Sequence, residues 1–109
     1  MTDQASEALK RLDDRLEALH QALAQEDWQR LAELNNGVPE LVDPVMDALE
    51  QRRLSAGAVQ QRLRALDQFV SQADEAARRA RAEAKEALAQ VGQNRKAASA
   101  YARVSDRKR

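Results

Sequence analysis

The residues that could carry chemistry in this chain are few, and they do not form a catalytic set. His20 is the only histidine and there is no cysteine. A zinc site therefore lacks enough nitrogen and sulfur ligands, and a thiolate nucleophile is absent. The adjacent carboxylates Asp13–Asp14 and Asp74–Glu75 diverge if they lie on helices, because neighbouring helical residues point in different directions. We interpret His20 as an ordinary boundary residue beside an apolar stripe. We therefore predict no enzyme activity, no metal and no cofactor.

A cluster of basic residues over positions 78–85 raises the question of nucleic-acid binding. Glu75 precedes Arg79 by four residues, and further glutamates follow at 83 and 86, so i,i+4 ion pairs would neutralise much of this face. The three glycines are isolated from one another, which excludes a glycine-rich phosphate loop. We expect no direct contact with nucleic acid.

The length of 109 residues fits a single domain. The chain carries 18 acidic and 18 basic side chains. The charge is unevenly distributed: residues 1–50 carry 12 acidic and 4 basic side chains, and residues 51–109 carry 6 and 14. This split favours two halves that lie side by side, or two copies that pack head to tail. No apolar run approaches the roughly 20 residues that cross a bilayer, and residues 1–12 lack the apolar core of a secretory signal. We expect a cytoplasmic protein with no membrane partner.

Leucine spacing predicts a first helix over residues 6–25, since its apolar residues recur at steps of three and four. These residues are Leu9, Leu12, Leu16, Leu19 and Leu23. Asp27 is a suitable N-cap for a second helix that begins at Trp28. The segment 35–39 contains Gly and Pro and should break it, and Asp43–Pro44 is a further start signal. Residues 27–53 therefore form either one kinked helix or two short helices in line.

Ser55 can cap a third helix that is much longer. Its apolar positions follow a heptad pattern without a slip: Val59, Leu63, Leu66, Val70, Ala73, Ala77, Ala80, Ala84, Ala87 and Val91. Gly92 is expected to end this helix and to act as a hinge. The predicted fold is all-α: an elongated antiparallel three-helix bundle with one long helix and a short C-terminal fourth helix or tail. We place the bundle domain at residues 1–92 and the tail at residues 93–109.

Three of these features resemble the FliT-type flagellar export chaperones. They are the segment Ala22–Leu31 around Trp28, the long heptad helix from Ser55 to Val91, and the ending Asn94–Val104 with its lysine, small residues and late tyrosine. Pro39 and Pro44 depart from the unbroken second helix of that family. The resemblance implies a cytoplasmic chaperone of the filament cap protein that prevents premature assembly and aids delivery to the export apparatus. It also implies that some members bind export components or a flagellar transcription regulator, and that the C-terminal segment can cover the cargo site.

The change from bulky to small residues along the third helix indicates where a partner could bind. Alanine buries little area but lets another helix approach closely. We expect an amphipathic cargo helix to lie on a surface formed by Leu41, Val45, Phe69, Val70, Ala73, Ala77 and Ala80. Tyr101 and Val104 would occupy this groove in the absence of cargo. The alternative for each residue is plain bundle core, and for Phe69 and Val70 it is the favoured one.

Two other classes of function remain open. A structural coiled-coil protein that only oligomerises, for example as a homodimer, would explain the regular heptads. The alanine-rich half argues against it, because two-stranded coiled coils prefer larger residues at these positions. The other alternative is a transcription-regulating partner protein or a nucleic-acid-binding regulator, for which salt-dependent retention on DNA would be the evidence.

Overall fold

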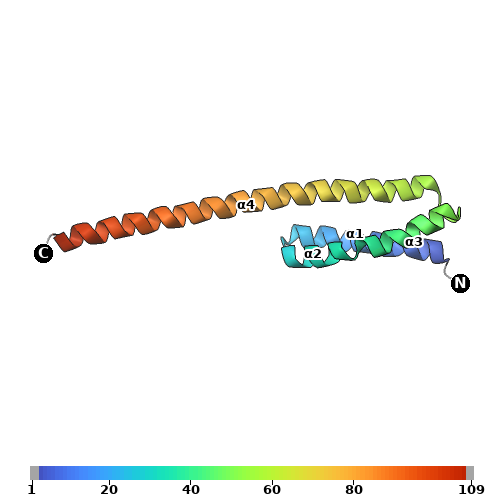
Figure 1. Ribbon diagram of the computed structural model, residues 1–109, viewed down its shortest axis with the longest axis horizontal. Helices are drawn as coiled ribbons and strands as arrows, with labels where there is room; N and C mark the ends of the chain where they lie inside the picture. The colour runs from blue at the N-terminus through green and yellow to red at the C-terminus, as the bar shows by residue number, and fades with distance from the viewer. Residues whose placement is uncertain (1–2, 108–109) are drawn as a thin grey trace. The chain divides into compact units, whose positions relative to one another are not determined.

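The computed structural model describes residues 3–107, with side-chain surroundings for residues 3–102. This part of the chain is helical, with no strand among its residues, which confirms the all-α class. Its helices are α1 (Gln4–Ala24), α2 (Trp28–Asn36), α3 (Val38–Glu50) and α4 (Ala56–Arg107) (Figure 1). The chain divides into two compact units, residues 1–73 and residues 74–109, called here the first unit and the second unit.

Helix α1 begins two residues before the predicted start because Asp3 caps it. The carboxylate of Asp3 accepts a hydrogen bond from the N–H of Ala5 at 3.2 Å, which satisfies one of the free donors at the helix end. The leucine stripe is confirmed: Leu12 and Leu19 are each only 1% exposed, and the other leucines of the stripe are half-buried. This face is the part of α1 that packs into the first unit.

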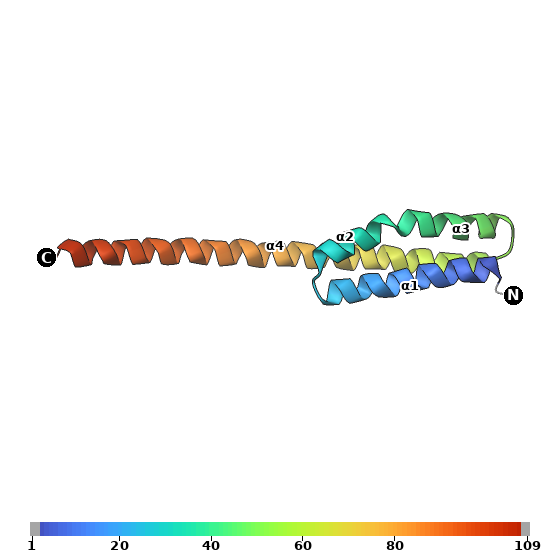
Figure 2. The ribbon, with the colours of Figure 1, turned by 90° about the horizontal axis from the view of Figure 1, so that it is seen from below.

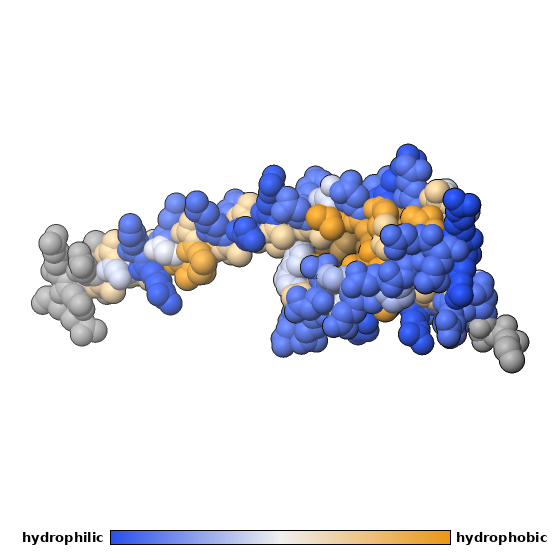
Figure 3. Space-filling view, turned by 45° about the vertical axis from the view of Figure 1, so that its right-hand side comes forward, coloured by the Kyte–Doolittle hydropathy of each residue, from blue (hydrophilic) through white to orange (hydrophobic). Residues whose placement is uncertain are grey.

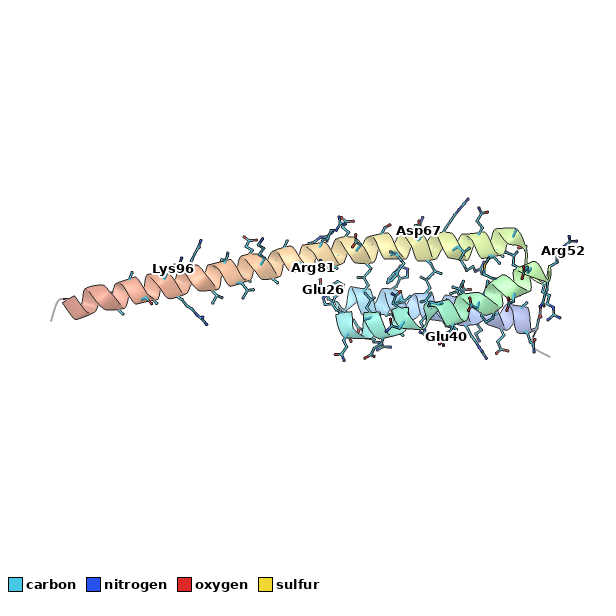
Figure 4. All side chains as sticks on the ribbon, in the orientation of Figure 1. Glu26, Glu40, Arg52, Asp67, Arg81 and Lys96 are labelled. Atoms are coloured by element: carbon cyan, nitrogen blue, oxygen red, sulfur yellow. The ribbon has the colours of Figure 1, made fainter. Side chains whose placement is uncertain are left out.

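The turns that follow α1 and α3 share one geometry. After α1, the N–H groups of Glu26 and Asp27 donate to the carbonyls of Leu23 and Ala22, both at 3.0 Å. Such paired bonds close a helix through one left-handed residue, usually glycine. Here the left-handed residues are Glu26, with φ of 53°, and Arg52, with φ of 60° (labelled in Figure 4). Each turn therefore places an L-residue in a conformation that costs roughly 1–2 kcal/mol.

The region between α2 and α3 resolves the alternative left open by the sequence in favour of two short helices. Asp27 caps α2 as predicted, accepting from the N–H of Arg30 at 3.2 Å. Gly37 separates α2 from α3. Just before this break, the Arg15 guanidinium of α1 donates to the carbonyl of Leu34 at 2.9 Å, and the Gly37 N–H donates to the same carbonyl at 3.3 Å.

Gly37 leaves space for the Arg15 side chain and does not supply an unusual backbone conformation. A Cβ atom at position 37 would lie 2.6 Å from Nη1 of Arg15, whereas its φ of −87° is ordinary. The prediction that Asp43–Pro44 starts a helix is wrong. Pro44 lies inside α3, and Pro39 occupies the first turn of that helix, where a missing N–H costs nothing.

The core of the first unit joins α1, α3 and the beginning of α4. Leu12, Val45 and Val59 form its centre, and Figure 2 shows α1 and α3 alongside this part of α4. Partly buried side chains from the same three helices and the α3–α4 turn surround it: Ala8, Leu9, Leu41, Val42, Leu49, Leu54 and Leu66. At the edge, Arg62 and Asp13 form an ion pair at 3.2 Å.

Helix α4 is capped as predicted but does not end where predicted. The Ser55 hydroxyl accepts from the N–H of Ala58 at 3.1 Å. The helix then continues across Gly92 to Arg107, so the predicted stop at Gly92 and the separate short fourth helix are both wrong. A glycine costs only about 1 kcal/mol in a helix interior. Without a proline after it, that cost is too small to end a helix rich in alanine and long polar residues.

Candidate protein-binding surface

The residues predicted to bind cargo on the first unit differ sharply in exposure. Val45 is completely buried and Phe69 is 4% exposed, so both belong to the closed core. For Phe69 this agrees with the alternative favoured from the sequence, in which it is a plain core residue. Val70, by contrast, is 57% exposed. Ala73 is half-buried.

The register of α4 explains why Phe69 and not Val70 is buried. Phe69 faces α1, where its ring meets the edge of the His20 ring with centroids 5.0 Å apart and planes at 80°. Arg62, seven residues earlier and on the same side, pairs with Asp13 of α1. Leu63 and Val70 each follow by one residue and are turned away, so they form an exposed apolar edge of the first unit.

Leu41 of the predicted surface lines an open groove between α1 and α3. The groove has a volume of about 410 Å³, and its walls include Ala8 and Pro44 together with the charged side chains of Arg11 and Glu40. The groove therefore combines mostly apolar walls with charged side chains at its border.

The second unit presents its apolar residues along one side of α4. Ala77 and Ala80 of the predicted surface are half-buried, and two larger residues are more accessible: Leu88 is 72% exposed and Val91 is 47% exposed. The α4 stripe, as we name it, consists of Ala77, Ala80, Ala84, Leu88 and Val91, at steps of three and four that keep one face. Figure 3 shows apolar surface between hydrophilic side chains along this unit.

Leu88 was missed by the sequence prediction because Ala87, its neighbour, continues the heptad pattern. The available signal was residue size: Leu88 is the one leucine in the second unit. A single exposed leucine is ordinary on a protein surface, so Leu88 matters here because it shares one helix face with the exposed Val91 and the alanines.

Tyr101 does not cover an apolar surface in this conformation. Its side chain is 80% exposed, and α4 passes through residue 101 without a hinge at Gly92. The side chain of Val104, which was predicted to act with Tyr101, lies outside the residues whose surroundings the structure describes.

The basic cluster of the second unit is partly neutralised, as predicted. Arg79 pairs with Glu75 at 3.4 Å, and Arg78 pairs with Asp74 at 3.0 Å. Arg81 and Lys85 form no ion pair with another described residue. Residues 74–109 carry ten basic and five acidic side chains, whereas residues 1–73 carry eight and thirteen. The two units therefore have net charges of +5 and −5.

Other kinds of site find no support in the described residues. No group of three or more His, Cys, Asp or Glu side chains between residues 3 and 107 is arranged to hold a metal ion. Among the same residues, no helix carries an apolar stretch long enough to cross a membrane. His20 is exposed, and its ring contacts the ring of Phe69.

Comparisons with known proteins add no identification. The chain matches no protein-family model, and no curated protein or solved structure matches it. The resemblance to FliT-type chaperones therefore rests on the sequence features described above.

Proposed function

We propose that the protein is a cytoplasmic flagellar export chaperone of the FliT type. In this proposal it binds the filament cap protein, prevents its premature assembly and aids its delivery to the export apparatus, with export components or a flagellar transcription regulator as further partners. The first unit acts as an antiparallel three-helix bundle in which α2 and α3 together form one arm. The second unit supplies the binding surface.

The observation that carries the proposal is the exposure of the α4 stripe. Leu88 and Val91 are accessible, and alanines occupy the neighbouring positions of the same face. Contact between apolar side chains and a partner gains about 25 cal/mol per Å² of buried apolar surface, while the alanines let a partner helix lie close to the α4 backbone. An amphipathic helix with apolar residues at the same spacing is the partner that fits this face.

The resemblance supplies the identity of the partner. The segment around Trp28 and the ending Asn94–Val104 resemble the chaperone family. The exposed stripe by itself supports only a helix-binding protein, and the likeness selects the filament cap protein among helical partners.

A binding experiment with two matched variants tests the proposal. The C-terminal region of the cap protein is titrated into the full chain by calorimetry. Ala84→Glu places a charge on the α4 stripe and is expected to weaken binding by about tenfold or more, because the carboxylate must be desolvated. Ala82→Glu makes the same change two residues away, about 200° around the helix, and should leave the affinity unchanged.

Two results would contradict the proposal. One is the absence of heat and of co-purification with the cap protein fragment. The other is equal weakening by both variants, which would indicate that helix α4 as a whole, and not its stripe, affects binding.

The second candidate function is a structural protein that only oligomerises. The unbroken 52-residue helix α4 favours it, since long helices are typical of coiled-coil assemblies. A stable oligomer that fails to bind the cap protein would select this function over the chaperone.

A further inference from the structure

Two exposed edges of α4 carry opposite charges beside large apolar residues. In the first unit, Leu63, Asp67 and Val70 follow one another at steps of four and three, so they share one side of the helix. Leu63 is 38% exposed, and Asp67 points outward in Figure 4. We name these residues the acidic edge.

The second unit repeats this spacing with the opposite charge. Arg81, Lys85 and Leu88 also follow at steps of four and three, and all three are exposed. We name them the basic edge. Neither Asp67 of the acidic edge nor the two cations of the basic edge form an ion pair with another described residue.

We infer that the acidic edge docks against the basic edge of a second copy of this chain, with the two α4 helices antiparallel. A parallel arrangement in register would bring Asp67 against Asp67 and Lys85 against Lys85, which is unfavourable. The antiparallel arrangement brings Asp67 opposite Lys85 of the second copy and Leu63 opposite its Leu88. The charges of the units, −5 and +5, favour the same pairing over longer distances.

The two-fold symmetry of such a dimer allows the contact to form twice. Each copy carries one edge of each kind, and a two-fold axis exchanges them, as in other isologous interfaces. This inference does not depend on the proposed cargo, because it concerns only copies of this chain. Leu88 belongs to both surfaces, so a dimer and a cargo helix would compete for it.

Charge reversal tests the pairing through the mass of the full chain, measured by light scattering over a concentration series. The wild-type chain is expected to dimerise. Asp67→Lys and Lys85→Asp each create like-charge contacts and should each raise the dimer dissociation constant by about tenfold. The double variant Asp67→Lys/Lys85→Asp restores opposite charges and should dimerise like the wild type, as should an equimolar mixture of the two single variants.

A control and two contradicting results complete the experiment. Glu86→Lys changes net charge as Asp67→Lys does, but its position lies about 100° around the helix from Lys85, so dimerisation should be unchanged. Circular dichroism checks that each variant remains helical.

A wild-type chain with the mass of a single copy throughout the concentration series would overturn the inference. The same mass would be found if the two edges paired within one copy, so that case also counts against the inference. A dimer that is weakened by the single variants and not restored by the double variant would overturn it as well.

Discussion

The two ends of α4 show how one helical pattern can serve two purposes. In the first unit, Val59, Leu66 and Phe69 lie on the side that packs against α1 and α3. In the second unit the heptad positions that continue those of Val59 and Leu66 carry Ala80 and Ala87, and the large residues Leu88 and Val91 are exposed. Heptad spacing therefore predicts a continuous helix, while residue volume separates the part that forms a core from the part that remains accessible.

Matched leucine truncations should give the largest difference between the two units. Leu12→Ala removes a side chain at the centre of the first-unit core and should lower the free energy of unfolding by about 2–5 kcal/mol. Leu88→Ala is the same substitution at an exposed site and should change it by less than about 0.5 kcal/mol. Urea unfolding followed by circular dichroism measures both. Similar losses would mean that Leu88 is part of a core.

The left-handed residues of the first unit offer a gain in stability. Glu26→Gly should raise the free energy of unfolding by about 1 kcal/mol, because glycine adopts the observed φ without a clash of its Cβ. Glu33→Gly makes the same change inside α2 and should lower it by about 1 kcal/mol. Thermal unfolding of both variants checks the opposite signs. A loss of stability in Glu26→Gly would show that the charge or side chain at position 26 matters more than its backbone.

Replacement of glycine by alanine should change the stability of the two units differently. A Cβ atom added at Gly92 would meet no neighbouring atom within 4 Å, so Gly92→Ala should stabilise the second unit by about 0.8–1.0 kcal/mol and increase helix content on heating. At Gly37 the added methyl group would displace the Arg15 guanidinium from the Leu34 carbonyl, which offsets the gain in helix propensity. Gly37→Ala is therefore expected to be close to neutral.

A double variant sharpens this comparison. In an Arg15→Ala background the clash at position 37 is absent, so Gly37→Ala should then stabilise the chain. If Gly37→Ala is as favourable in the wild type as in that background, the contact with Arg15 does not constrain this position.

The ion pairs should give the smallest effects. Arg62→Gln removes the contact between α4 and Asp13 of α1, a pair that is partly exposed, and should cost less than about 1 kcal/mol. Arg78→Gln removes the i,i+4 pair with Asp74 and should cost about 0.3–0.5 kcal/mol. Both losses should shrink at high salt. A salt-independent loss in Arg62→Gln would point to lost packing of its aliphatic stem.

Local signals in the sequence predicted the starts of α2 and α4. Asp27 and Ser55 cap helices as expected, because a side-chain acceptor two or three residues before a free N–H works without tertiary help. Gly92 failed as a stop signal, since its weak propensity is outweighed by the helix formers around it. Pro44 failed as a start signal because helix α3 had already begun at Val38.

The accessible surface was harder to predict than the helices. The heptad pattern assigns Leu63 and Val70 to the packed face, yet α1 and α3 cover a face rotated toward Phe69. That rotation is fixed by contacts of α4 with His20 and Asp13 of α1, which are distant in sequence. Apolar periodicity cannot choose between two adjacent residues when both are large, so Phe69 and Val70 could be distinguished only in three dimensions.

The placement of the aromatic residues gives each unit its own optical reporter. Trp28, the only tryptophan, is half-buried at the start of α2, and Tyr101, the only tyrosine, is exposed in the second unit. Fluorescence of the indole and of the phenol can therefore follow the two parts of the unlabelled chain separately, during denaturation or when a ligand is added.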